Sequence, residues 1–191
     1  MPELSIDPKT TALVLIDLQN GITSRVTAPH TSADVVSRAV RLADAFRAKG
    51  SPVALVRVAF SADGRDRLSM PTDDPGPPMT PSAEWSEIRA ELGPKPGDIV
   101  ITKHQWGAFY GTELELQLRR RGITTIVLGG IATNIGVEST ARDAFERAFA
   151  LVFAEDATSA LSAEAHAFSM KNIFPRLGLV RSTSDVLAAL G

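Results

Sequence analysis

One stretch of the sequence indicates the fold of this chain: Ile123-Thr-Thr-Ile-Val-Leu-Gly-Gly-Ile-Ala-Thr-Asn-Ile-Gly-Val-Glu-Ser-Thr-Ala-Arg142. Its apolar run stops at two glycines and is followed by a segment rich in small residues, which is the pattern of a strand, a tight turn and a helix. In a parallel sheet, such a turn presents backbone N–H groups at a helix N-terminus, where they can hold an anion or a polarised oxygen atom. We therefore look for the functional site at this turn.

On both sides of this stretch, short apolar segments alternate with amphipathic ones along the chain. The alternation predicts a single domain over residues 1–191 with an α/β fold, in which helices cover both faces of a mainly parallel sheet of five or six strands. The expected strands are 11–16, 52–58, 98–101, 123–128 and 151–154, with a short one near 179–180. Helices are expected at 31–50, 162–173 and 183–190, and a further helix is expected to begin with a capping box at Thr112-Glu-Leu-Glu. The helix that follows the fourth strand is expected to bury one face, made of Val137, Ala141, Ala144, Phe145 and Ala148.

The segment 61–96 interrupts this alternation. Seven of the twelve prolines lie in it, which excludes a central strand and predicts a long loop. A short helix could form within residues 81–89. A loop of this length could cover a pocket or contact another subunit.

Composition restricts the function further. The chain has 191 residues, a net charge of −2 and no cysteine. The charge offers no basic surface for nucleic acid or a membrane. Without cysteine there are no disulfides, no thiolate metal sites and no thiol nucleophiles. The N-terminus lacks the basic and apolar segments of a signal peptide, and the chain lacks an apolar run of about 20 residues, so a cytoplasmic location is expected.

Three groups follow predicted strands at the edge where ligands bind in such sheets. Asp17 follows the first strand, Lys103 the third, and the turn Ala132–Gly136 the fourth. A carboxylate, an ammonium group and a set of backbone amides could carry a proton, support it electrostatically and hold an oxyanion. Each also has a structural interpretation: the aspartate could cap a turn, the lysine could lie on the surface, and the paired glycines could serve only the turn.

Three motifs carry a resemblance to a known family. They are Ala12-Leu-Val-Leu-Ile-Asp-Leu-Gln19, Lys103-His-Gln-Trp-Gly-Ala-Phe109 and Gly130-Ile-Ala-Thr-Asn-Ile-Gly-Val-Glu-Ser-Thr-Ala141. In order and spacing they resemble the isochorismatase-like hydrolase superfamily, which also includes nicotinamidases and N-carbamoyl amidohydrolases. The resemblance implies a three-layer fold with a six-stranded parallel sheet, and self-association of the chain.

The resemblance also implies a site made of Asp17, Lys103 and residue 136, with a cis peptide between Ile131 and Ala132 in an oxyanion turn formed by the backbone of Ala132 and Gly136. In the amidase branches, position 136 is a cysteine that attacks the substrate. This chain has Gly136 there, so the covalent thioester mechanism is not available to it. The nearby hydroxyls of Thr133, Ser139 and Thr140 are poor replacements, because no histidine is adjacent to them in the sequence.

A glycine at position 136 is similar to the isochorismatases, which cleave a vinyl ether without a protein nucleophile. In that chemistry Asp17 would protonate the methylene carbon of the substrate, and water would capture the oxocarbenium ion. Asp17 must then hold a proton near neutral pH. Burial raises the pKa of an aspartate and a nearby lysine lowers it, so the sequence leaves this balance open.

No metal and no cofactor are expected. Nicotinamidases that bind a divalent ion use an Asp-x-His pair and further histidines after the second strand, where this chain reads Ser61-Ala-Asp-Gly-Arg-Asp-Arg67. His30, His104 and His166 are far apart in the sequence and lack the spacing of metal ligands. His104 could point into the pocket beside the lysine or lie on the surface.

Gln19, Trp106 and Phe109 are the candidates for contact with the substrate, and Trp85 is a further candidate wall. The glutamine could orient a substrate or a water molecule beside Asp17. The aromatic rings could line the pocket, although packing in the core or an interface is the more usual role for at least one of them.

These observations predict a cofactor-free hydrolase of a small metabolite, with isochorismate as the most specific possibility. Asp17 would act as acid and base, with Lys103 as its partner. Two alternatives stay open: a catalytically silent member that binds a small molecule or a protein, and an amidase that uses activated water. The expected partners are a small-molecule substrate and further copies of the chain.

Overall fold

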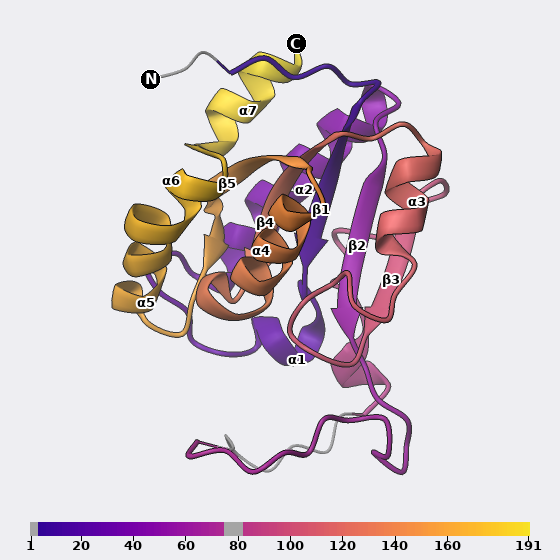
Figure 1. Cartoon of the computed structure of the whole chain (residues 1–191), viewed down its shortest axis with the longest axis vertical. Helices are drawn as coiled ribbons and strands as arrows, with labels where there is room; N and C mark the ends of the chain where they lie inside the picture. Colours follow the sequence, from indigo (N-terminus) through magenta and orange to yellow (C-terminus); the bar gives the residue numbers. More distant parts are fainter. Residues whose placement is uncertain (1–3, 75–81) are drawn as a thin grey trace.

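The computed structural model describes residues 4–74 and 82–191, and its core is a six-stranded sheet (Figure 1). The strand order is β3-β2-β1-β4-β5-β6, and all neighbouring strands run parallel. The sheet confirms the predicted α/β fold. The strands are β1 (Thr11–Ile16), β2 (Val53–Val58), β3 (Ile99–Lys103), β4 (Thr125–Ile131), β5 (Ala150–Ser159) and β6 (Leu179–Arg181).

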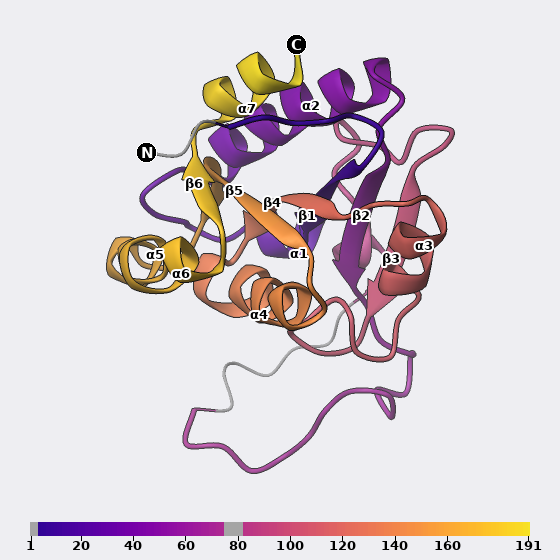
Figure 2. The same cartoon turned by 45° about the horizontal axis from the view of Figure 1, so that its top comes forward.

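Helices cover both faces of the sheet, as Figure 2 shows. Successive residues of β1 point to opposite faces, and all six are buried, which explains why this strand is continuously apolar. One apolar cluster packs against α2 and α7, and the other packs against α3, α4 and α6. The helices are α1 (Asn20–Thr23), α2 (Ser32–Ala48), α3 (Leu114–Arg120), α4 (Glu138–Glu146), α5 (Ala163–Phe168), α6 (Phe174–Leu177) and α7 (Thr183–Leu190).

Two π-helical segments interrupt the expected helices. Thr133–Val137 forms a π-helical turn, η2, between β4 and α4. Ser169–Ile173 forms another, η3, which joins α5 to α6, so the helix expected at 162–173 is in fact a short α-helix followed by a π-helical segment. Extra residues in a helical turn are frequent at functional sites, and η2 lies at the turn singled out from the sequence.

The expected capping box at Thr112 is wrong. α3 begins only at Leu114, and the Thr112 hydroxyl accepts from the Leu114 N–H at 3.2 Å while donating to the Ala108 carbonyl. The Glu115 side chain does not return to the backbone but pairs with Arg147. The hydroxyl thus stabilises the turn before the helix.

The buried face of α4 also differs from the expectation at its end. Phe145 is 49% exposed, and Ala148 lies beyond the helix with a positive φ of 57°. This left-handed residue turns the chain so that Phe149 packs against Phe109 in the core. The buried aromatic residue is therefore Phe149, which follows the turn at Ala148, and not Phe145.

The long segment between β2 and β3 contains a single turn of 3-10 helix, Glu84–Ser86, within the region where a short helix was expected. Four of the seven prolines, at 75, 77, 78 and 81, lie outside the described residues, as do residues 1–3 of the predicted domain. Within the described ranges, we find no helix with the length and apolar character needed to cross a bilayer.

Candidate active site

The strand order places the candidate residues at one edge of the sheet. The strands added before and after β1 lie on opposite sides of it, so the strand order reverses between β1 and β4, and ligands in such folds bind outside the carboxyl ends of the strands at this point. Asp17 follows β1, and the η2 turn follows β4. Ile16 pairs with Gly130, which has a φ of 124° and lies so close to β1 that an added Cβ would be 2.1 Å from the Ile16 carbonyl oxygen.

Lys103 forms an ion pair with Asp17 across this edge. Its Nζ donates to the Asp17 Oδ2 at 2.9 Å and to the Gln105 carbonyl at 3.0 Å. The lysine is 2% exposed and the aspartate 6%, so the surface interpretation of Lys103 does not hold. Asp17 also has a positive φ of 55°, a conformation uncommon outside glycine and found at functional sites.

The two oxygens of the Asp17 carboxyl group have different surroundings. Oδ2 accepts the hydrogen bond from Lys103, whereas Oδ1 is buried without a hydrogen-bond partner among residues 4–74 and 82–191. Burial raises the pKa of Asp17 above its ordinary value, and the charge and hydrogen bond of Lys103 only partly oppose this. The balance that the sequence left open therefore favours a carboxyl group that can hold a proton.

Position 136 lies against this carboxyl group. A Cβ built on Gly136 would be 3.1 Å from the Asp17 Oδ2 and 3.0 Å from a methyl group of Ile16. The peptide bond between Ile131 and Ala132 is cis, as the resemblance implied. A side chain at position 136 would thus contact Asp17 closely, and glycine places no side chain there.

Comparison with known proteins decides the family. The sequence model of the isochorismatase domain matches residues 11–185. The chain belongs to the isochorismatase family.

Several members of the isochorismatase family are similar over nearly the whole chain. The isochorismatase family protein YecD of Escherichia coli O157:H7 is 57% identical, with 98% of this chain and 100% of the relative covered. The ureidoacrylate amidohydrolase RutB of Methylobacterium radiotolerans is 32% identical, with coverages of 98% and 82%.

Solved structures of the family give the same picture. An isochorismatase family protein from Burkholderia thailandensis has a TM-score of 0.94 at 51% identity, with 97% of each chain covered. The N-carbamoylsarcosine amidase of Thermoplasma acidophilum has a TM-score of 0.73 at 30% identity, with 91% of this chain and 96% of that chain covered. These relatives support a hydrolase with a small-molecule substrate.

The candidate contact residues of this isochorismatase family member differ in their positions. Gln19 is fully buried, and its side-chain amide bonds the Val58 N–H and carbonyl and the Trp85 carbonyl. It therefore joins the end of β2 to the long segment, and its polar atoms are taken up by the backbone. The Trp85 ring packs against Gly21, where an added Cβ would clash with it.

The two aromatic candidates after β3, Phe109 and Trp106, differ in how far their side chains are buried. Phe109 is 4% exposed and packs in the core against Phe149, so core packing is the interpretation that holds for it. The Trp106 side chain is 65% exposed, and only its carbonyl oxygen lies near position 136, at 3.5 Å from the added Cβ. His104 is partly exposed, and its Nδ1 lies 2.7 Å from the Ala59 carbonyl oxygen.

One expectation about histidine is wrong, and the structure also brings together two histidines that are far apart in the sequence. His30 and His166, although far apart in the sequence, both contact Glu155. In addition, the His166 Nδ1 lies 2.9 Å from the Thr133 Oγ1, so this hydroxyl does have an adjacent histidine. Thr133 is fully buried and offers no surface to a substrate carbonyl, so the contact does not make it an accessible nucleophile. Glu155 at the end of a predicted strand was the only sequence signal for this cluster.

Two hollows of the surface formed by described residues lie apart from the Asp17 side chain. One of about 450 Å³ adjoins the η2 turn at Asn134 and Glu138, and one of about 470 Å³ lies between Thr23, Val36 and Arg89. Because Oδ1 is buried, a substrate reaches it only when the groups that cover it move.

Proposed function

We propose that this isochorismatase family member hydrolyses a small metabolite by acid–base catalysis at Asp17, without a covalent enzyme intermediate. The observation that carries the proposal is the Asp17 carboxyl group itself. It is buried, its pKa is raised, one oxygen is held by Lys103, and the other has no partner within the described chain. Gly136 places no side chain against this carboxyl group, at the position where a side-chain nucleophile would otherwise contact it.

For a vinyl ether substrate such as isochorismate, the chemistry follows from this arrangement. The protonated Asp17 gives its proton to the terminal methylene carbon, and the neighbouring carbon becomes an oxocarbenium ion. Water adds to that carbon and returns a proton to the Asp17 carboxylate, after which the hemiketal collapses to a carbonyl compound and an alcohol. Lys103 stabilises the Asp17 carboxylate between the two proton transfers.

A second candidate reaction is hydrolysis of an amide or ureido compound by activated water. It is favoured by the names of two relatives, the ureidoacrylate amidohydrolase and the N-carbamoylsarcosine amidase. In this reaction the Asp17 carboxylate would take a proton from a water molecule, because Gly136 offers no side-chain nucleophile in its place. A raised pKa makes the carboxylate a stronger base, so the same residue serves either reaction.

A panel of three compounds separates these reactions from a silent, ligand-binding role. The purified protein is incubated with isochorismate, ureidoacrylate and N-carbamoylsarcosine, and reaction samples are quenched in acid for intact-protein mass spectrometry. We expect turnover of isochorismate and no mass increase on the protein.

Other outcomes have different meanings. Turnover of a ureido compound alone would favour the water-activated amidase, and a covalent adduct in the quenched samples would contradict the proposal. Tight binding of these compounds without turnover would replace it with the silent member that binds a ligand.

A further inference from the structure

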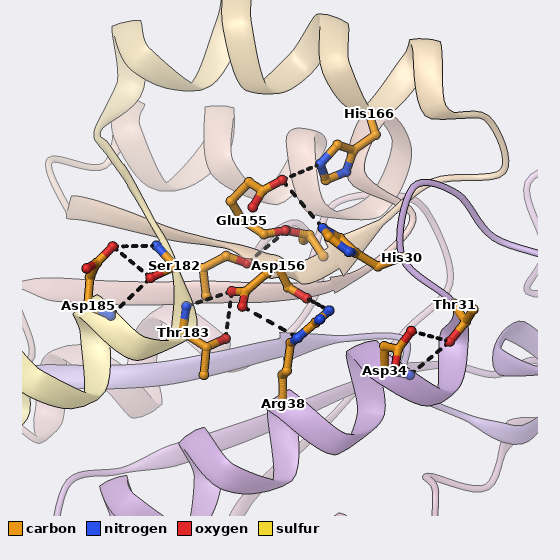
Figure 3. Close-up of polar contacts among 12 residues, drawn as sticks. His30, Thr31, Asp34, Arg38, Glu155, Asp156, His166, Ser182, Thr183 and Asp185 are labelled. Carbon is orange, nitrogen blue, oxygen red and sulfur yellow. Dashed lines mark hydrogen bonds and ion pairs between the residues drawn. The ribbon is translucent and has the colours of Figure 1, made fainter.

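A second group of polar side chains meets on the other side of the η2 turn from Asp17. His30 belongs to the loop between α1 and α2, Glu155 to β5 and His166 to α5. Figure 3 shows the two imidazole rings pointing toward the same carboxylate. The proposed hydrolysis uses none of these three residues.

The two distances from the Glu155 carboxylate are close to those between the ligands of one metal ion. The Glu155 Oε1 lies 3.2 Å from the His166 Nε2 and 3.5 Å from the His30 Nε2, and one ligand atom from each of the three residues lies within 4.8 Å of the others. Bonds of about 2.0–2.1 Å in tetrahedral geometry place neighbouring ligand atoms about 3.3 Å apart. The contact to His30 is also long for a hydrogen bond.

The His166 ring nitrogen that faces away from Glu155, Nδ1, has a hydrogen-bond partner of its own. Its Nδ1 lies 2.9 Å from the Thr133 Oγ1, so a hydrogen bond there fixes the ring and directs Nε2 toward Glu155. Metal-binding histidines are commonly oriented in this way by a hydrogen bond to the other ring nitrogen. The His166 side chain is only 4% exposed, which limits its freedom further.

The backbone of His30 is held as firmly. Its carbonyl accepts from the Thr27 hydroxyl at 2.8 Å and from the Ser159 hydroxyl at 2.7 Å. The neighbouring Ala28 and Ala160 form an isolated antiparallel bridge. The loop is thereby fastened to the end of β5, and the imidazole is positioned before any ion arrives.

We propose that His30, Glu155 and His166 bind one divalent transition-metal ion, with Zn²⁺ as the ion best suited to two imidazoles and a carboxylate. Zinc sites with two histidines and one glutamate leave a fourth position open for water or a ligand. The His30 and Glu155 side chains are 23% and 37% exposed, so an ion can enter from solvent. Through Thr133, the bound ion would fix the start of the η2 turn.

The test measures binding of Zn²⁺ to the full chain without a histidine tag. The protein is treated with chelator, dialysed and titrated with Zn²⁺ by calorimetry, and metal content is then determined by mass spectrometry. We expect one Zn²⁺ per chain, a Tm that rises until one equivalent is added, and affinity at least about tenfold weaker in His30→Gln and Glu155→Gln.

His104→Gln is the matched control, because the chain has only three histidines and this one lies outside the cluster. It should bind Zn²⁺ as the wild type does. His166→Gln removes a buried ring, so its result counts only if circular dichroism shows a folded protein; the two more exposed variants decide the question otherwise. Absence of binding in the wild type, or equal affinity in the His30 and Glu155 variants, would overturn the proposal.

Discussion

Asp17 is the residue on which the chemistry depends, and its charge state follows from its surroundings. The carboxyl group is buried, and a single lysine faces one of its oxygens. The free-energy cost of removing the carboxylate from water exceeds the stabilisation by the ion pair with Lys103, so the pKa of Asp17 is raised. The same burial that makes Asp17 a proton donor makes its charged form unfavourable in the folded protein.

Asp17→Asn should therefore become more stable relative to the wild type as the pH rises. The unfolded pKa is about 3.9, and the folded pKa lies above it. The stabilising contribution of the protonated carboxyl is complete below the unfolded pKa and is lost as the pH rises through the folded one. Between the two, we expect the difference in the free energy of unfolding to change by up to about 1.4 kcal/mol per pH unit.

Urea unfolding of both proteins across this range measures the difference. A difference that does not change with pH would show that the pKa of Asp17 is not raised by folding.

At the scale of the element, the turn after β4 depends on two glycines with different roles. Gly130 has a positive φ and touches the backbone of β1, whereas Gly136 has an ordinary φ and touches the Asp17 side chain. The first allows the two strands to approach, and the second determines which chemistry is possible between them.

Gly130→Ala should destabilise the protein by about 3 kcal/mol or more, because its Cβ would overlap the Ile16 carbonyl at an unfavourable φ. Gly122→Ala is the control: it also has a positive φ, of 70°, but nothing lies within 4 Å of an added Cβ. It should lose only about 1–2 kcal/mol. Chemical unfolding compares the two, and equal losses would mean that the contact with β1 is not limiting.

The local sequence patterns predicted which helices and strands form better than they predicted where each one begins and ends. The β1 strand was evident because five of its six residues are apolar, as suits a strand that is buried on both faces. The capping box at Thr112 was wrong because the hydroxyl serves the preceding turn instead, and the end of α4 was missed because Ala148 adopts a left-handed conformation that its side chain does not announce.

The site was predictable where residues follow strands and unpredictable where loops bring residues together. Asp17 and Lys103 meet because they lie at the carboxyl ends of parallel strands of one sheet. His30 and His166 meet only because the loop before α2 is fastened to the end of β5, a contact between segments far apart in the sequence. The sequence also could not show that the amide of Gln19 is used by the backbone.

At the scale of the whole molecule, we propose that the chain self-associates through its exposed aromatic residues. Tyr110 and Trp106 are 75% and 65% exposed and lie on the same loop after β3. Exposed aromatic side chains are enriched in protein interfaces. Sedimentation velocity should show an oligomer that Tyr110→Glu weakens and that the control Val26→Glu, at a 91% exposed apolar position, leaves intact. A monomeric wild type would contradict this proposal.

The most direct test of the account is the kcat/KM of Asp17→Asn on the substrate that the wild type turns over. Removing the acid–base group should lower it by roughly 10²–10⁴-fold while circular dichroism shows an intact fold. Asp98→Asn is the control, because it breaks another aspartate–cation pair, with Arg47, away from Asp17; it should lose stability and keep its rate. An Asp17→Asn variant with the wild-type rate would show that the reaction does not pass through this carboxyl group.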